Sequence, residues 1–115
     1  MNDLFDFTQL DELMSADPDE LRQVLWDLFT DFRKSFAALP EKASSGGLGD
    51  ISMEAHQLRG VSASFGLKRL SDTARDLEMA AGEGNVEKSR ELITTVRELL
   101  DESERELKVQ RPEYF

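Results

Sequence analysis

The chain has 115 residues and a formal net charge of −10, from 24 acidic and 14 basic residues. This length suits one domain with its own hydrophobic core. Cysteine is absent, which excludes disulfides, thiolate metal sites and cysteine nucleophiles. The basic residues are interspersed with acids, whereas phosphate contacts need clustered Lys and Arg. We therefore do not expect a nucleic acid as a partner.

The sequence shows no sign of a membrane segment or a signal peptide. No apolar run approaches the length of a membrane span, and the start MNDLFDF has neither the basic nor the apolar region of a signal peptide. We expect a cytoplasmic protein that does not contact a membrane. A single domain is predicted over residues 1–115, with an N-terminal segment over 1–16 and a C-terminal tail over 109–115 that carries no functional signal.

The first two predicted elements are helices. A short helix is predicted over Thr8–Met14, where Thr8 and Asp11 form a weak capping pattern. A stronger start signal follows, with Asp17 as the N-cap, Pro18 at the first helical position and acidic residues in the first turn. These signals place the start of a long helix at residue 18.

The second helix is predicted to reach Leu39 and to end before Pro40. Its apolar residues recur every three or four positions and so predict a buried stripe, which consists of Leu21, Val24, Leu25, Leu28, Phe32, Ser35, Phe36 and Leu39. The following segment is rich in glycine and serine, and it predicts a flexible connector over residues 40–49.

Three further helices complete the chain. The third is predicted from Asp50 to Phe65, with Gly66 as its stop, and the fourth ends at the glycines of GEG. Asn85 is the expected N-cap of a long fifth helix. The buried stripes of the fourth and fifth helices are Leu67, Leu70, Ala74, Leu77 and Ala81, then Val86, Ser89, Ile93, Val96, Leu100, Ser103 and Leu107. The expected fold is all-α, an antiparallel four-helix bundle with a short additional N-terminal helix.

The only histidine of the chain, His56, lies on the third predicted helix. A helix advances by about 100° per residue, which places His56 roughly 160° from Leu58 at the centre of the buried stripe. A lone histidine is more often a structural residue, but this phase turns the imidazole toward solvent. Arg59 follows within one turn and brings a cation to one edge of the ring.

Small residues lie beside this histidine. Gly60 and Ala63 remove bulk from the helix surface one and two turns beyond it. The alternative for Gly60 is close packing against another helix, which its outward phase disfavours. An exposed ring nitrogen, a bare strip and a cation together suit phosphoryl transfer to and from histidine. We expect Met53, Gly60, Ala63 and Ser64 to form the docking surface for a partner.

The segment AHQLRGVSASFGLKRLSDTARDLE, residues 55–78, resembles the signature of histidine-phosphotransfer (HPt) domains. The similarity in length and helix order extends over nearly the whole chain. By this resemblance, His56 is the phosphorylated residue, and Arg59 replaces the usual lysine that neutralises the phosphoryl group. Gly60 corresponds to the glycine that leaves room for the partner, and Gly66 to the turn after the active helix.

Glu78 corresponds to a position where family members often carry a Glu or Gln bonded to the histidine. A carboxylate there would accept the Nδ1 proton and make Nε2 the nucleophile. The alternative is an ordinary helical ion pair between Glu78 and Arg75.

Trp26 lies off the main stripe of the second helix. One interpretation is a contact with the first helix, through Phe5, Phe7, Leu10 or Leu13. The other is an exposed apolar patch on which a partner docks.

The resemblance implies a free-standing carrier that accepts a phosphoryl group on His56 from a receiver-domain aspartate and passes it to another response-regulator receiver. Its expected partners are receiver domains and a hybrid histidine kinase, and we expect a monomer. One histidine and no cysteine leave no metal site, so no cofactor is predicted, and Mg²⁺ is expected on the receiver. The carrier is not an enzyme by itself. The alternatives are the phosphoacceptor module of a chemotaxis-type kinase and a non-catalytic helical docking protein.

Overall fold

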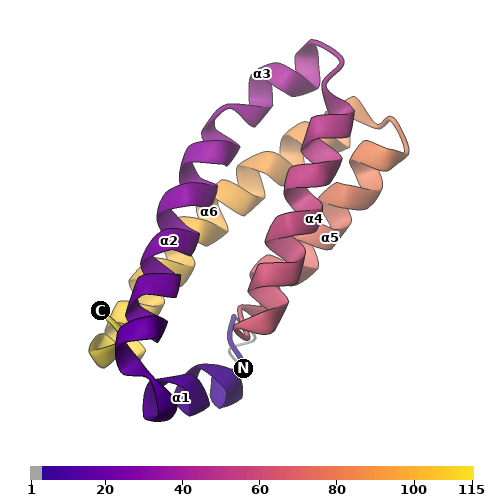
Figure 1. Ribbon diagram of the computed structural model, residues 1–115. Helices are drawn as coiled ribbons and strands as arrows, with labels where there is room; N and C mark the ends of the chain where they lie inside the picture. The colour runs from indigo at the N-terminus through magenta and orange to yellow at the C-terminus, as the bar shows by residue number, and fades with distance from the viewer. Residues whose placement is uncertain (1–3) are drawn as a thin grey trace.

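The computed structural model describes residues 4–115, and within that range the chain forms helices and no strand. The elements are α1 Phe7–Ala16, α2 Pro18–Ala37, α3 Leu39–Ser44, α4 Leu48–Ser64, α5 Lys68–Gly82, α6 Val86–Gln110 and a short 3₁₀ helix, η1, Pro112–Tyr114. The long helices α2, α4, α5 and α6 lie alongside one another, and α1 crosses the end where α2 begins (Figure 1). The predicted all-α class is confirmed. No helix among residues 4–115 has the length and apolar character needed to cross a membrane.

Side-chain caps define where the helices start. Asp17 accepts a hydrogen bond from the Glu20 N–H at 3.1 Å, and Asn85 accepts one from the Lys88 N–H at 3.0 Å, so both predicted caps are confirmed. The cap of α1 is Asp6, whose Oδ1 accepts from the Thr8 N–H at 3.0 Å, and not the predicted Thr8. The extended backbone of Asp6 places its carboxylate over the free N–H groups of the first turn, which explains the difference.

The predicted connector over residues 40–49 is wrong at both ends, because residues 40–44 belong to α3 and residues 48–49 to α4. The second helix, predicted to reach Leu39, ends at Ala37, and Leu39 begins α3. Pro40 stands in the first turn of α3, so the proline that was expected to end a helix lies at the start of the next one. Its fixed φ and missing N–H suit a first helical turn. Leu39 and Ala43 are buried and lie four residues apart, which gives α3 an apolar face against the bundle.

The core follows the predicted stripes closely. On α6, the predicted residues from Ser89 to Leu107 are all buried, while Val86 at the helix start is exposed. On α2, the predicted stripe residues Val24, Phe32 and Ser35 are only half-buried, and the first two face a groove. Two core residues carry an unsatisfied polar atom: the hydroxyls of Ser62 on α4 and Ser103 on α6 have no hydrogen-bond partner among residues 4–115.

The C-terminal tail packs against the N-terminal helix. Tyr114 is fully buried, and its hydroxyl donates a hydrogen bond to Asp11 of α1. Arg111 donates to the same carboxylate through Nε at 3.0 Å and Nη2 at 3.2 Å, and its guanidinium lies 4.0 Å from the centroid of the Phe7 ring. The tail therefore holds α1 in place against the bundle.

The segment before α1 is attached to the end of α4. The Asp6 N–H donates to the Gly66 carbonyl at 2.7 Å. Gly66 has a φ of +71°, and a Cβ at this position would overlap the Asp6 carbonyl oxygen. A glycine is thus required both by the turn that ends α4 and by the close approach of the N-terminal segment. These contacts fix the end of the helix that carries His56.

Candidate functional site

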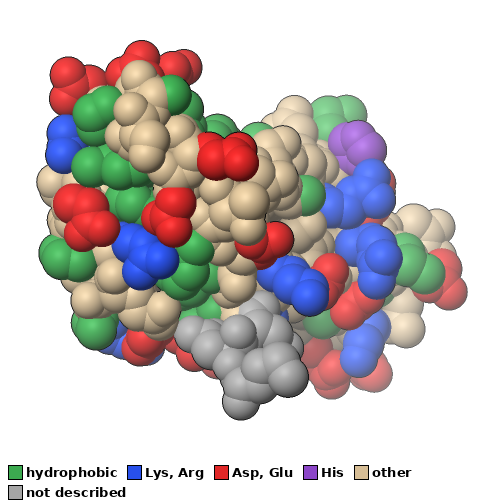
Figure 2. All heavy atoms as spheres, turned by 90° about the horizontal axis from the view of Figure 1, so that it is seen from below, with side chains coloured by type: hydrophobic (Ala, Val, Ile, Leu, Met, Phe, Trp, Pro, Cys, Tyr) green, Lys and Arg blue, Asp and Glu red, His purple; other side chains and the backbone are tan. Residues whose placement is uncertain are grey.

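His56 lies on the exposed face of α4. The residues of α4 that are buried are Ile51, Ala55, Leu58 and Ser62, and 61% of the His56 side chain is exposed. The predicted outward phase is confirmed. Figure 2 shows the one histidine at the molecular surface, with Lys and Arg side chains gathered beside it.

Glu78 of α5 contacts the histidine ring. Its Oε2 lies 2.9 Å from His56 Nδ1, and 26% of the Glu78 side chain is exposed. The contact arises because Leu77, the preceding residue, is buried in the bundle and turns Glu78 toward the flank that faces α4. Within the described part of the chain, Glu78 pairs with His56 and Arg59 and not with Arg75, so the alternative helical ion pair is not formed.

Arg59 completes a cluster of three side chains. Its Nε lies 3.3 Å from Glu78 Oε1, and its Nη2 lies 3.1 Å from His56 Nδ1. A second contact between the helices holds this region together, because the Ser71 hydroxyl donates to the Arg59 carbonyl at 3.2 Å.

The two contacts at Nδ1 cannot both be hydrogen bonds. A carboxylate accepts only from a protonated Nδ1, whereas a guanidinium donates only to an unprotonated one. We assign the proton to Nδ1, because Arg59 then pairs with Glu78 while the ring donates to the same carboxylate. The other tautomer would place the Glu78 carboxylate against a nitrogen lone pair at 2.9 Å. Nε2 therefore carries the free lone pair of the neutral ring.

An open groove borders the histidine. It is lined by Phe32 of α2 and by His56, Gln57, Gly60, Val61, Ser64 and Phe65 around α4. A Cβ on Gly60 would meet no atom within 4 Å, so packing does not require a glycine here. Of the predicted docking residues, Gly60 and Ser64 line the groove. Met53 and Ala63 are exposed but lie outside it.

Phe32 and Val61 are among the groove residues that the sequence did not identify as functional, together with Gln57 and Phe65. Phe32 and Val61 fall within helical apolar stripes, and the stripe alone does not distinguish a core residue from one at the edge of a groove. Their half-buried state depends on the separation of α2 and α4.

Trp26 does not pack on α1. The α1 contact predicted for this side chain is wrong, because 64% of Trp26 is exposed. Together with Lys108 of α6 and Phe115 of the tail, Trp26 lines a different groove. This groove shares no residue with the groove at His56. The ring of Phe7 in α1 contacts Arg111 instead.

Fold and site together define a class: an all-α protein that presents one oriented histidine at its surface. The family model of the Hpt domain matches residues 20–106, and the chain therefore belongs to the Hpt domain family. Searches among curated proteins and among solved structures found no match. Hpt domains are phosphocarrier modules of two-component signalling, where they interact with receiver domains and histidine kinases.

Proposed function

We propose that this chain is a phosphorelay carrier in which His56 accepts a phosphoryl group from the aspartyl phosphate of one receiver domain and passes it to another. The observation that supports this most is the 2.9 Å contact between Glu78 and Nδ1 of the exposed His56. It retains the ring proton on Nδ1 and leaves the Nε2 lone pair available to attack from the solvent side.

The transfer step follows from this arrangement. The Nε2 lone pair attacks phosphorus, the N–P bond forms, and the P–O bond to the receiver's aspartate breaks, with the electron pair leaving on that carboxylate. The proton stays on Nδ1, so the phosphorylated ring becomes positively charged and the Glu78 carboxylate stabilises it. Arg59 offsets the negative charge of the phosphoryl oxygens. Transfer to the second receiver is the reverse of these steps.

The remaining components come from the partners. The receiver supplies Mg²⁺, and this chain brings no cofactor to the reaction. A hybrid histidine kinase is the proposed source of the phosphoryl group, and the carrier acts as a monomer in the cytoplasm. We take α2, α4, α5 and α6 as the antiparallel four-helix bundle of the domain, with α1 as the additional N-terminal helix. Met53 and Ala63 extend the docking surface beyond the groove.

Incubation with phosphorylated receiver domains tests the proposal. The wild type should acquire an acid-labile, base-stable label, and His56→Gln should acquire none. Arg59→Ala should change the transfer rate or the phosphohistidine lifetime while the free energy of unfolding stays within about 0.5 kcal/mol, as for other surface sites. Acid-stable label, or label that survives His56→Gln, would contradict the proposal. Label taken only from a separate ATP-binding kinase domain would favour the kinase-linked module.

A further inference from the structure

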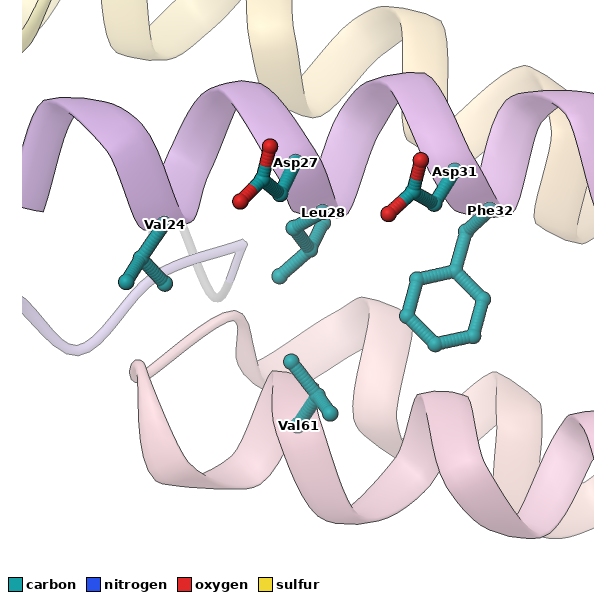
Figure 3. Close-up of a pocket in the computed structure, with 6 residues that line it drawn as sticks. All are labelled: Val24, Asp27, Leu28, Asp31, Phe32 and Val61. Atoms are coloured by element: carbon teal, nitrogen blue, oxygen red, sulfur yellow. The ribbon is translucent and has the colours of Figure 1, made fainter.

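A second groove separates α2 from α4. Figure 3 shows Val24, Leu28 and Phe32 pointing from α2 toward Val61 on α4. Leu28 is buried at the bottom, and the other three side chains are half-buried, so apolar surface remains open to solvent along the groove.

Two carboxylates line the same groove. Asp27 and Asp31 project from α2, one helical turn apart, on the side nearest the viewer (Figure 3). Both are exposed, and no Lys or Arg among residues 4–115 forms an ion pair with either one. Asp27 accepts one hydrogen bond, from the Gln23 amide at 3.0 Å. The groove therefore combines apolar walls with a negative edge whose charge no side chain of the described part neutralises.

This groove is continuous with the one at the histidine. Phe32 and Val61 line both of them, so a partner that covers His56 also reaches the surface between α2 and α4. A molecule that fills both grooves must bury apolar groups against Phe32 and Val61 and place positive charge beside Asp27 and Asp31.

We propose that the groove between α2 and α4 selects receiver domains that present an apolar ridge flanked by Lys or Arg side chains. The inference rests on the proposed function and adds which receivers the site accepts. Asp27 and Asp31 act on recognition, through long-range attraction that speeds association and depends on ionic strength. They take no part in the chemistry at His56.

The test compares two phosphoryl donors. One is a phosphorylated receiver domain that labels the wild type, and the other is phosphoramidate, a small molecule that phosphorylates histidine without docking. The variant is Asp27→Lys/Asp31→Lys. The matched control is Glu91→Lys/Glu98→Lys, which makes the same charge change on the exposed face of α6, outside both grooves.

We expect the α2 variant to take phosphate from the receiver about tenfold more slowly than the wild type at low salt. The difference should be smaller at 0.5 M NaCl, because the Debye length there is only about 4 Å and the attraction is screened. Labelling by phosphoramidate should be unchanged, and the α6 control should lose less than threefold. Equal losses in variant and control, or a parallel loss with phosphoramidate, would overturn the inference. So would a wild-type dimer in sedimentation that the α2 variant dissociates, because a second copy would then occupy the groove.

The two proposals fail in different ways. A wild type that takes phosphate from phosphoramidate but from no receiver contradicts the proposed function. A wild type that receivers label normally, together with an α2 variant that they label equally fast, contradicts only the selection by Asp27 and Asp31.

Discussion

At the scale of single residues, Gly60 bears most directly on the proposal that a partner docks on α4. A glycine in an exposed helix interior costs about 1 kcal/mol relative to alanine. A Cβ at Gly60 would touch no atom within 4 Å, so close packing gives no compensation for that cost. Its position in the groove beside His56 suggests that the missing side chain leaves space for another molecule.

Substitutions of Gly60 separate folding from transfer. Gly60→Ala should raise the free energy of unfolding by about 1 kcal/mol. Gly60→Gln should also fold, because its side chain points to solvent, but it should slow transfer from a receiver by occupying the groove. Gly82→Gln is the matched control, since a Cβ there also meets nothing within 4 Å and Gly82 lies outside the groove. Thermal unfolding and transfer rates measure the two effects. A loss of stability in both Gly60 variants with transfer intact would show that Gly60 packs against the fold.

How much the sequence predicts depends on how many helices a feature involves. The exposure of His56 follows from the phase of one helix, and it was predicted correctly. The contact of Glu78 with His56 depends on how α5 is rotated against α4, and only the family resemblance suggested it before the structure. The exposed Trp26 was misassigned, because the helical phase does not say which neighbour covers a side chain.

At the scale of elements, α3 shows why helix ends are hard to predict. In the sequence Pro40 predicts the end of a helix, but a proline is equally suited to a first helical turn. Only the burial of Leu39 and Ala43 decides between the two roles. The glycines that follow α3 do form a turn, where Gly46 has a φ of +83°.

Two helices of the core, α4 and α6, carry buried serines that can be tested. The hydroxyls of Ser62 and Ser103 are buried without a hydrogen-bond partner in the described range. Ser62→Ala and Ser103→Ala should each raise the free energy of unfolding by about 1 kcal/mol, because the desolvated hydroxyl is removed and alanine favours the helix. Ser89→Ala is the control, since the Ser89 hydroxyl donates to the Asn85 carbonyl at 2.7 Å. Urea unfolding measures all three variants, and equal losses at Ser62 and Ser89 would contradict the assignment.

At the scale of the whole molecule, the N-terminal helix α1 and the C-terminal tail meet at Asp11. The hydrogen bond from Arg111, reinforced by that from the Tyr114 hydroxyl, holds the pKa of Asp11 below its usual value. Burial raises the pKa of the Tyr114 hydroxyl, and the bond to Asp11 raises it further, so this donor stays protonated at neutral pH. The resulting cluster links α1 to the tail after α6.

Because the pKa of Asp11 is lower in the folded state, its stabilisation is present above the unfolded pKa of about 3.9 and is lost as pH falls through the folded value. Asp11→Asn should lower the free energy of unfolding at pH 7. The loss should be at most about 1 kcal/mol, because 49% of the side chain is exposed to solvent. The gap to the wild type should shrink below about pH 4. Urea unfolding between about pH 3 and pH 7 measures the difference in unfolding free energy between variant and wild type. Asp76→Asn is the control, because Asp76 is exposed. A gap that does not change with pH would contradict this role.

The central claim concerns one atom, Nε2 of His56, and nuclear magnetic resonance of the phosphorylated, ¹⁵N-labelled protein tests it most directly. The chain has a single histidine, so a phosphorus–nitrogen coupling in its ring has only two assignments. Because Glu78 retains the proton on Nδ1, the phosphorus should couple to Nε2, with Nδ1 still protonated. Coupling to Nδ1, or a phosphate that couples to no ring nitrogen, would contradict the mechanism.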